Sequence, residues 1–220
     1  MNDIIELSGP DLAAMLSSRI CHDLINPVGA IGNGLDALDD PAQASMKDLA
    51  QELIANAAKQ SLAKLEFARL AYGASSTAGT DFDTRECERV AQIYYDIEKA
   101  NLNWNFEAIL VPKHKGKLLM NMLLIASEAV FRGGEVSVSM TGEAGNEAIE
   151  IVATSDKEKR QKTLIPANVE AYISGRVEEV TAREIQPFYT GLLARLSNMD
   201  IQVSLDQAVF RFTATPIAAD

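Results

Sequence analysis

Near the start of the chain, residues 8–41 read SGPDLAAMLSSRICHDLINPVGAIGNGLDALDDP, and this stretch decides the architecture of the N-terminal part. Pro10 suits the first turn of a helix, where a missing N–H is tolerated, and Ser8 or Gly9 can cap that turn. The helix is predicted to run to about Leu38, because Asp39-Asp40-Pro41 then interrupts it. One long helix is therefore predicted, with a second helix that begins directly after this break.

A second helix is predicted from Pro41 to Tyr72, with Asp40 as its N-cap and Gly73 at its end. The small-residue segment 74–80 that follows is predicted to be a linker. Helices of about 30 residues are roughly 45 Å long. The first part of the chain is therefore predicted to be a long helical hairpin.

Apolar side chains lie on more than one side of this hairpin. In the first helix they recur at steps of three and four, in a stripe predicted to lie opposite His22: Leu12, Leu16, Ile20, Leu24, Val28, Ile31, Leu35 and Leu38. In the second helix they fall on two sides, with Met46, Leu49, Leu53 and Phe67 on one and Ile54, Leu62 and Leu65 on the other. A lone hairpin would leave one of these faces in water, so we predict a homodimer in which two hairpins form a four-helix bundle.

Charge and composition restrict the partners and the location. The formal net charge is -11, so nucleic acid and anionic membranes are not expected as partners. Apolar runs fall short of the ~18 residues that cross a bilayer, and residues 1–9 lack the basic start of a secretion signal. Cys21 and Cys87 alone are no disulfide framework. We therefore predict a cytoplasmic protein.

From Asp81 onward the pattern becomes mixed α/β. The predicted helices are Asp83 to Ala100, Lys115 to Arg132 and Ile185 to Met199. The predicted strands are Leu102 to Leu110 and two hairpins, 135–140 with 147–153 and 201–205 with 209–214, and 155–162 is predicted to be a charged loop. The aromatic side chains Trp104, Phe106, Phe131 and Phe188 are expected in this core. We predict an α+β protein with a helical domain over 1–75 and an α/β domain over 81–220.

His22 is the residue that suggests chemistry. Arg19, His22 and Asn26 are spaced i, i+3 and i+7, which predicts one polar row on the outer face of the first helix. A neutral imidazole is a good nucleophile, and phosphoryl transfer requires mainly positioning and charge stabilisation. Arg19 could neutralise phosphoryl oxygens, Asn26 could hydrogen-bond them, and Asp23 could fix the tautomer of the ring.

Three plainer interpretations of His22 remain open at this point. A lone histidine on a helix is usually just solvated. Cys21 and His22 could bind a metal, although adjacent helical residues point about 100° apart. Cys21 could be a nucleophilic thiol, but His114 is the only other histidine that could serve it as a base.

The segment His22-Asp23-Leu24-Ile25-Asn26-Pro27 resembles the phosphoacceptor box of sensor histidine kinases. In that box a histidine is followed by an acidic, an aliphatic, a variable and a small polar residue and then by proline. The box lies on the first helix of a dimerising hairpin in that family, as predicted here. The resemblance implies that His22 accepts a phosphoryl group.

The nucleotide-binding signature of such kinases is missing. The stretch MLLIASEAVFRGGEVSVS (122–139) resembles the kinase asparagine box and the strand after it, but Leu123 and Ser127 stand where the kinases have asparagines. Leucine offers no oxygen ligand to Mg²⁺. Ala153 replaces the aspartate that reads adenine, and the glycine-rich lid is absent, since Gly191 is the only glycine between Gly175 and Asp220. We therefore predict a degenerate, histidine-kinase-like ATPase domain that does not bind ATP.

A phosphoacceptor hairpin followed by such a domain resembles the dimeric histidine phosphotransferases, and among them the ChpT-type proteins of alphaproteobacteria. Residues 13–23 and 67–75 carry this similarity, which extends over nearly the whole chain. It implies a phosphorelay in which His22 takes the phosphoryl group from the receiver domain of a hybrid histidine kinase and passes it to receiver domains of response regulators. The receiver would supply Mg²⁺, and this chain would need no cofactor. Asn26 stands where relatives often have serine.

Two other functions remain to be separated from this one. The chain could be a non-catalytic module that binds receivers or kinases through the same surface. It could also be a true histidine kinase with an unusual nucleotide site.

Overall fold

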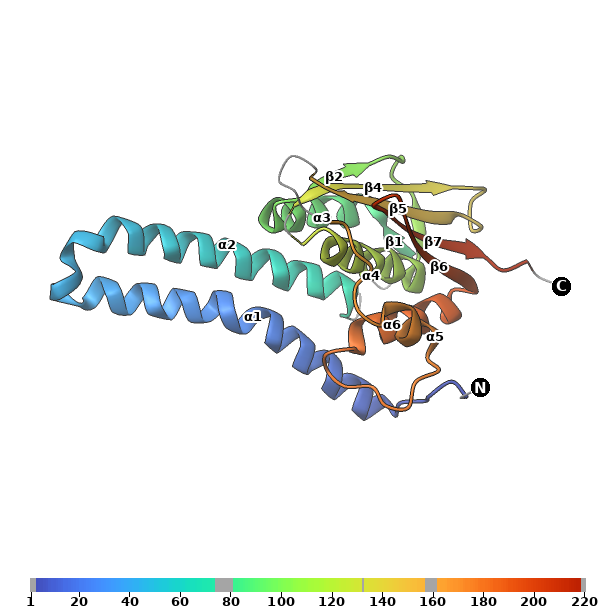
Figure 1. Cartoon of the computed structure of the whole chain (residues 1–220), viewed down its shortest axis with the longest axis horizontal. Helices are drawn as coiled ribbons and strands as arrows, with labels where there is room; N and C mark the ends of the chain where they lie inside the picture. Colours follow the sequence, from blue (N-terminus) through green and yellow to red (C-terminus); the bar gives the residue numbers. More distant parts are fainter. Residues whose placement is uncertain (1–2, 74–80, 132, 157–161, 219–220) are drawn as a thin grey trace.

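The protein is described here by a computed structural model, which covers residues 3–73, 81–131, 133–156 and 162–218. It has the predicted α+β architecture, a long helical hairpin followed by helices packed on a mixed sheet (Figure 1). The predicted linker 74–80 and most of the predicted charged loop lie outside the described residues. Within the described ranges, no helix is both long and apolar enough to cross a membrane. The division into domains 1–75 and 81–220 stays a prediction.

The hairpin consists of α1 (Gly9–Asp39), a 3-10 helix η1 (Pro41–Met46) and α2 (Lys47–Ala71). Ser8 is the N-cap of α1, and its hydroxyl oxygen accepts a hydrogen bond from the backbone N–H of Asp11 at 3.2 Å. Asp40 caps the restart, as predicted, through the backbone N–H of Ala42. The restart itself is a tighter 3-10 turn, so the regular second helix begins six residues later than Pro41.

The two helices pack through small residues. Pro27 and Gly34 are the buried residues of α1, and a side chain at Gly34 would meet Ile54 of α2 at 2.6 Å. Val28 and Leu35 of the predicted stripe are 51% and 50% exposed in the single chain. Because small side chains let helix axes approach closely, the contact between the two helices is centred on Pro27 and Gly34, and Val28 and Leu35 lie outside it.

The main sheet has five strands in the order β2-β4-β5-β7-β6, and only β2 and β4 run parallel. Both predicted hairpins are confirmed, with the strands β2 (Asn101–Trp104), β4 (Gly134–Thr141), β5 (Ala148–Ser155), β6 (Met199–Asp206) and β7 (Val209–Pro216). The prediction of one strand from Leu102 to Leu110 is wrong. The chain leaves the sheet after Trp104, and β3 (Leu110–Pro112) pairs instead with β1 (Asp81–Asp83).

Four further helices accompany the sheet: α3 (Thr84–Glu98), α4 (Lys113–Ala129), α5 (Val169–Ser174) and α6 (Ile185–Leu196). Helix α4 lies at the centre of the core and is in contact with α2, α3, α6 and β5. Phe67 and Leu70, near the end of α2, belong to the same buried cluster as α4. The base of the hairpin is thus fixed against the α/β part, while its outer half projects away from it (Figure 1).

Ion pairs also join the hairpin to the α/β part. Lys64 of α2 lies 3.3 Å from the carboxylate of Glu98 on α3, and Arg69 of α2 lies 3.0 Å from Glu86. The aromatic prediction is only partly correct, because Phe131 is 55% exposed. Helix α4 ends at Ala129, before the predicted Arg132, so Phe131 lies beyond the helix and outside the core.

Candidate functional site

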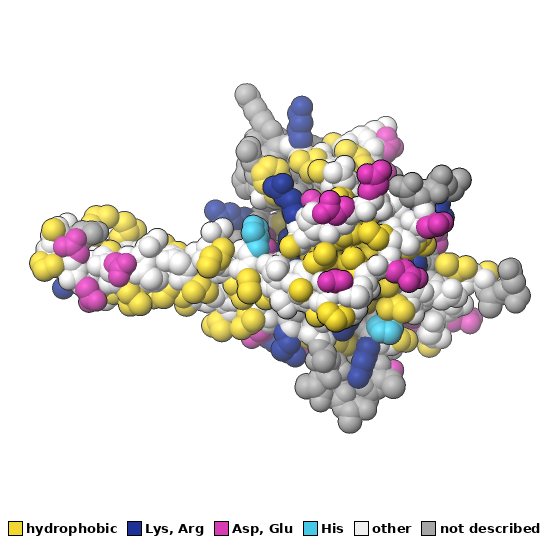
Figure 2. Space-filling view, turned by 90° about the horizontal axis from the view of Figure 1, so that it is seen from below, with side chains coloured by type: hydrophobic (Ala, Val, Ile, Leu, Met, Phe, Trp, Pro, Cys, Tyr) yellow, Lys and Arg dark blue, Asp and Glu magenta, His cyan; other side chains and the backbone are white. Residues whose placement is uncertain are grey.

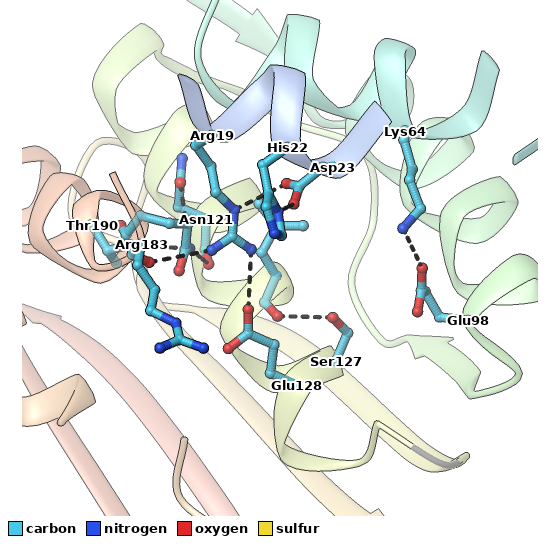
Figure 3. Close-up of polar contacts among 12 residues, drawn as sticks. Arg19, His22, Asp23, Lys64, Glu98, Asn121, Ser127, Glu128, Arg183 and Thr190 are labelled. Carbon is cyan, nitrogen blue, oxygen red and sulfur yellow. Dashed lines mark hydrogen bonds and ion pairs between the residues drawn. The ribbon is translucent and has the colours of Figure 1, made fainter. Parts of the chain in front are cut away.

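His22 lies on the exposed side of α1, close to the junction with the α/β part (Figure 3). Its side chain is 79% exposed, and its Nδ1 lies 3.2 Å from Oδ1 of Asp23. A carboxylate can only accept, so the nitrogen that faces it is the N–H. The other ring nitrogen, Nε2, then carries the lone pair.

Asp23 joins His22 to Arg19. Nε of Arg19 donates to Oδ2 of Asp23 at 3.0 Å, one helical turn away on α1. The two oxygens of Asp23 therefore have different neighbours, the imidazole on one side and the guanidinium on the other. Asp23 is in the place that the sequence predicted for a residue that fixes the tautomer of the ring.

Arg19 does not point along the predicted polar row. Its side chain is only 19% exposed, and Nη2 donates to the carboxylate of Glu128 on α4 at 3.2 Å. Nη1 donates to the backbone carbonyl of Arg183 at 3.4 Å. Burial alone would lower the pKa of Arg19, but the charges of Asp23 and Glu128 raise it above its usual value. The sequence could not place Arg19, because its strongest distant partner lies 109 residues away.

Asn26 lies about one turn beyond His22 on the same helix, and its side chain is exposed. Among the residues described here, no hydrogen bond joins Asn26 to His22 or to Arg19. The structure thus brings three of the four predicted residues together, Arg19, Asp23 and His22, and leaves Asn26 beside them in solvent. Its role in holding phosphoryl oxygens stays a prediction.

Two hollows flank Arg19. One is a groove of about 810 Å³ between α1, α4 and the segment before α6, and it contains His22 on its wall. Its other lining residues include Ser18, Ile125, Glu128, Pro166, Arg183 and Pro187. The second hollow, of about 200 Å³, lies between the hairpin and α3 and α4. The groove is the larger space, and it lies beside the imidazole on the side of the α/β part.

Glu128 and Arg183 are residues of the site that the sequence interpretation missed. Glu128 directly follows Ser127 in the stretch that resembles a kinase asparagine box, and it is a charged residue in a helix with twelve buried residues. The charge at this position could have marked Glu128 as a candidate site residue. Arg183 contributes its backbone carbonyl, which no sequence pattern reveals.

The positions where kinase residues are missing are packed inside the α/β part. Leu123 and Ala153 are fully buried, and the hydroxyl of Tyr95 donates to the carbonyl of Leu123 at 2.7 Å. Ser127 donates its hydroxyl to the carbonyl of Leu124 within α4. In the described part of the chain, no group of three or more His, Cys, Asp or Glu residues has the arrangement of a metal site.

Comparison with known proteins shows the family of this chain. The family described as "Histidine phosphotransferase C-terminal domain" matches residues 84–209, more than half of the chain. This chain belongs to the histidine phosphotransferase family. The family predicted from the sequence is thus confirmed.

Individual relatives cover nearly the whole chain. Protein phosphotransferase ChpT of Brucella abortus (strain 2308) is 39% identical over 200 residues, 90% of this chain and 92% of that protein. The solved structure of a bacterial phosphotransferase has a TM-score of 0.87 at 37% identity and covers 96% of this chain and 98% of its own. The histidine kinase AdeS of Acinetobacter baumannii aligns with 89% of this chain and 96% of its own, at 9% identity and a TM-score of 0.44.

Proposed function

We propose that this protein carries phosphoryl groups on His22, from the receiver domain of a hybrid histidine kinase to the receiver domains of response regulators in the cytoplasm. The single observation that carries the proposal is the exposed imidazole with its Nδ1 held by Asp23. That contact leaves Nε2 as the nucleophile on the solvent side. Membership in the histidine phosphotransferase family supports the same chemistry.

The transfer needs no group beyond the two proteins and the receiver's metal ion. The lone pair of Nε2 attacks the phosphorus of the aspartyl phosphate, the bond from phosphorus to the aspartate oxygen breaks, and the carboxylate leaves with the electron pair. The positive charge that develops on the ring lies beside the carboxylate of Asp23. In the second step the carboxylate of another receiver attacks phosphorus, and the P–N pair returns to Nε2. Mg²⁺ belongs to the acidic pocket of each receiver.

The packing of α4 and β5 supports a protein, rather than ATP, as the source of the phosphoryl group. Leu123 and Ala153 are fully buried where a kinase would present an asparagine and an aspartate to the nucleotide. Neither side chain has an oxygen for Mg²⁺ or a polar group for adenine. We infer that the α/β part of this chain holds no nucleotide.

The exposed apolar surface of the hairpin supports a homodimer. Large hydrophobic side chains are exposed along both helices, among them Ile25, Val28, Leu35, Leu49, Leu53, Leu62 and Leu65. Figure 2 shows hydrophobic side chains along the projecting hairpin on the face seen there. Contiguous apolar surface of this kind marks an interaction site. Two hairpins that cover these faces with one another would form the predicted four-helix bundle, with one His22 from each chain.

The test is phosphorylation by a receiver domain that carries radiolabelled acyl phosphate. The wild-type protein is expected to take up acid-labile label, and His22→Ala is expected to take up none. His114→Ala is the matched control, because His114 is the only other histidine and is also exposed. Label that persists in His22→Ala would contradict the proposal. Receiver binding without any labelling of the wild-type protein would favour a non-catalytic binding module.

A further inference from the structure

A continuous series of polar contacts links α4 of the α/β part to the imidazole of His22. Glu128 accepts from Nη2 of Arg19 at 3.2 Å, and Arg19 donates from Nε to Oδ2 of Asp23 at 3.0 Å. Oδ1 of Asp23 lies 3.2 Å from Nδ1 of His22. The dashed lines of Figure 3 follow these contacts from Glu128 to the ring. The series therefore links two residues that lie far apart in the sequence.

The side chains of the series differ in how freely they can move. Arg19 is the most enclosed, with 19% of its side chain exposed, and three acceptors surround its guanidinium: Asp23, Glu128 and the carbonyl of Arg183. Asp23 and Glu128 are each partly exposed. A planar guanidinium that donates in three directions has little rotational freedom left. Arg19 is therefore the rigid member that transmits the position of α4 to α1.

The orientation of Asp23 depends on this rigid guanidinium. The terminal torsion of an aspartate is broad, so a carboxylate beside a histidine can turn either oxygen, or neither, toward the ring. With Oδ2 engaged by Nε of Arg19, Oδ1 is the oxygen that remains for Nδ1 of His22. A guanidinium released from Glu128 could take both oxygens of Asp23 as a fork. The ring would then lose the acceptor that holds its proton on Nδ1.

We propose that Glu128 and Arg19 are positioning residues for the phosphoacceptor, acting through Asp23, so that the α/β part of the chain sets the tautomer and orientation of His22. The proposal rests on the phosphoacceptor role of His22 proposed above. It gives the α/β part a function that requires no nucleotide. Glu128 holds Arg19, Arg19 orients Asp23, and Asp23 keeps the proton on Nδ1 while Nε2 faces the phosphorus.

A plainer explanation of the Arg19–Glu128 pair is that it only holds the hairpin against the α/β part. The structure contains a pair of that kind, Lys64 with Glu98, at a similar distance of 3.3 Å, and no contact described here connects it to Asp23. Partly exposed ion pairs contribute little to stability. The two pairs can therefore be compared directly, since only one of them leads to the imidazole.

The experiment compares Glu128→Ala with the matched control Glu98→Ala in the full chain. The first readout is the rate at which His22 is phosphorylated, both by a phosphorylated receiver and by the small phosphodonor phosphoramidate. We expect Glu128→Ala to slow both reactions about tenfold, as displaced positioning groups do, and Glu98→Ala to leave both unchanged. Glu128→Gln keeps an oxygen acceptor for Nη2 of Arg19 and should retain most of the rate. A contact to the receiver alone would slow only the receiver reaction, which would overturn the positioning role.

The second readout is nitrogen NMR of the isotope-labelled imidazole of His22. The wild-type ring and the Glu98→Ala ring are expected to show the Nδ1–H tautomer, and Glu128→Ala is expected to shift the population toward Nε2–H. Identical spectra and identical rates in the two variants would overturn the inference while leaving the phosphoacceptor role intact. If the wild-type protein is never phosphorylated, the proposed function fails, and the NMR comparison still decides whether Glu128 orients the ring.

Discussion

Helices α1 and α4 are both long and rich in apolar residues, yet the fold uses them in opposite ways. Twelve of the seventeen residues of α4 are buried, whereas α1 buries Pro27 and Gly34 out of thirty-one. Helix α4 fills the centre of a core and leaves little of its own surface exposed. Helix α1 carries the exposed His22 and several exposed large hydrophobic residues, so it offers far more surface to a partner than α4 does.

The largest expected effect is a loss of dimerisation when charged residues replace exposed apolar residues of α1. Replacement of Val28 and Leu35 by glutamate places two charges in the surface that we expect to be buried between two copies. We expect the wild-type protein to sediment as a dimer and the double variant as a monomer, because unpaired charges are not tolerated in a desolvated interface. Analytical ultracentrifugation measures this.

The matched control is Asn33→Glu, which adds a charge at an exposed polar position of the same helix. It should remain dimeric. A wild-type protein that is monomeric at micromolar concentrations would contradict the four-helix bundle.

In α4 the expected effect is a loss of folding stability. Lys115 and Glu147 form a buried ion pair, and their exposed fractions are only 5% and 8%. Burial alone would raise the pKa of Glu147. The hydrogen bonds that its carboxylate accepts from Lys115 and from the backbone N–H of Gly145 hold this pKa below its usual value. Lys115→Ala leaves that carboxylate buried without its cation and should lower the free energy of unfolding by about 3 kcal/mol. Urea unfolding measures the change.

The double variant Lys115→Met with Glu147→Leu tests the cause. Since both charges are gone, most of the lost stability should return. A double variant as unstable as Lys115→Ala would show that the stability depends on the shape of the pair and not on the uncompensated charge.

A smaller effect is expected at the contact between the two helices of the hairpin. A side chain at Gly34 would lie 2.6 Å from Cγ1 of Ile54, whereas one at Gly32 would meet nothing within 4 Å. Gly34→Ala should therefore destabilise the protein by about 1–2 kcal/mol through overpacking. Gly32→Ala should stabilise it by up to about 1 kcal/mol, because alanine favours a helix. Thermal unfolding of the two variants gives opposite shifts, and shifts of the same sign would refute the packing face.

Sequence patterns predicted the parts of this fold that depend on near neighbours. The caps at Ser8 and Asp40 need contacts only two or three residues away, and the strand hairpins follow from alternation and a turn. The contact through Pro27 and Gly34 was not predicted, because a hydrophobic pattern marks large apolar side chains and not the small residues that let two helices approach closely.

The candidate site shows the same division. His22 and Asp23 are adjacent in the chain, and a motif marks them. The direction of Arg19 is set by Glu128, which arrives from a different part of the chain only when the fold is complete. Helical periodicity predicts Arg19 on the outer face with His22. The ion pair with the carboxylate of Glu128 instead directs its side chain toward the α/β part.

Transfer between two receiver domains tests the central claim most directly. One receiver carries radiolabelled acyl phosphate, the second is unlabelled, and this protein is added in less than stoichiometric amount with Mg²⁺ and no nucleotide. The account predicts that label reaches the second receiver through the wild-type protein and His114→Ala, and not through His22→Ala. Label that reaches the second receiver equally fast with His22→Ala would contradict it.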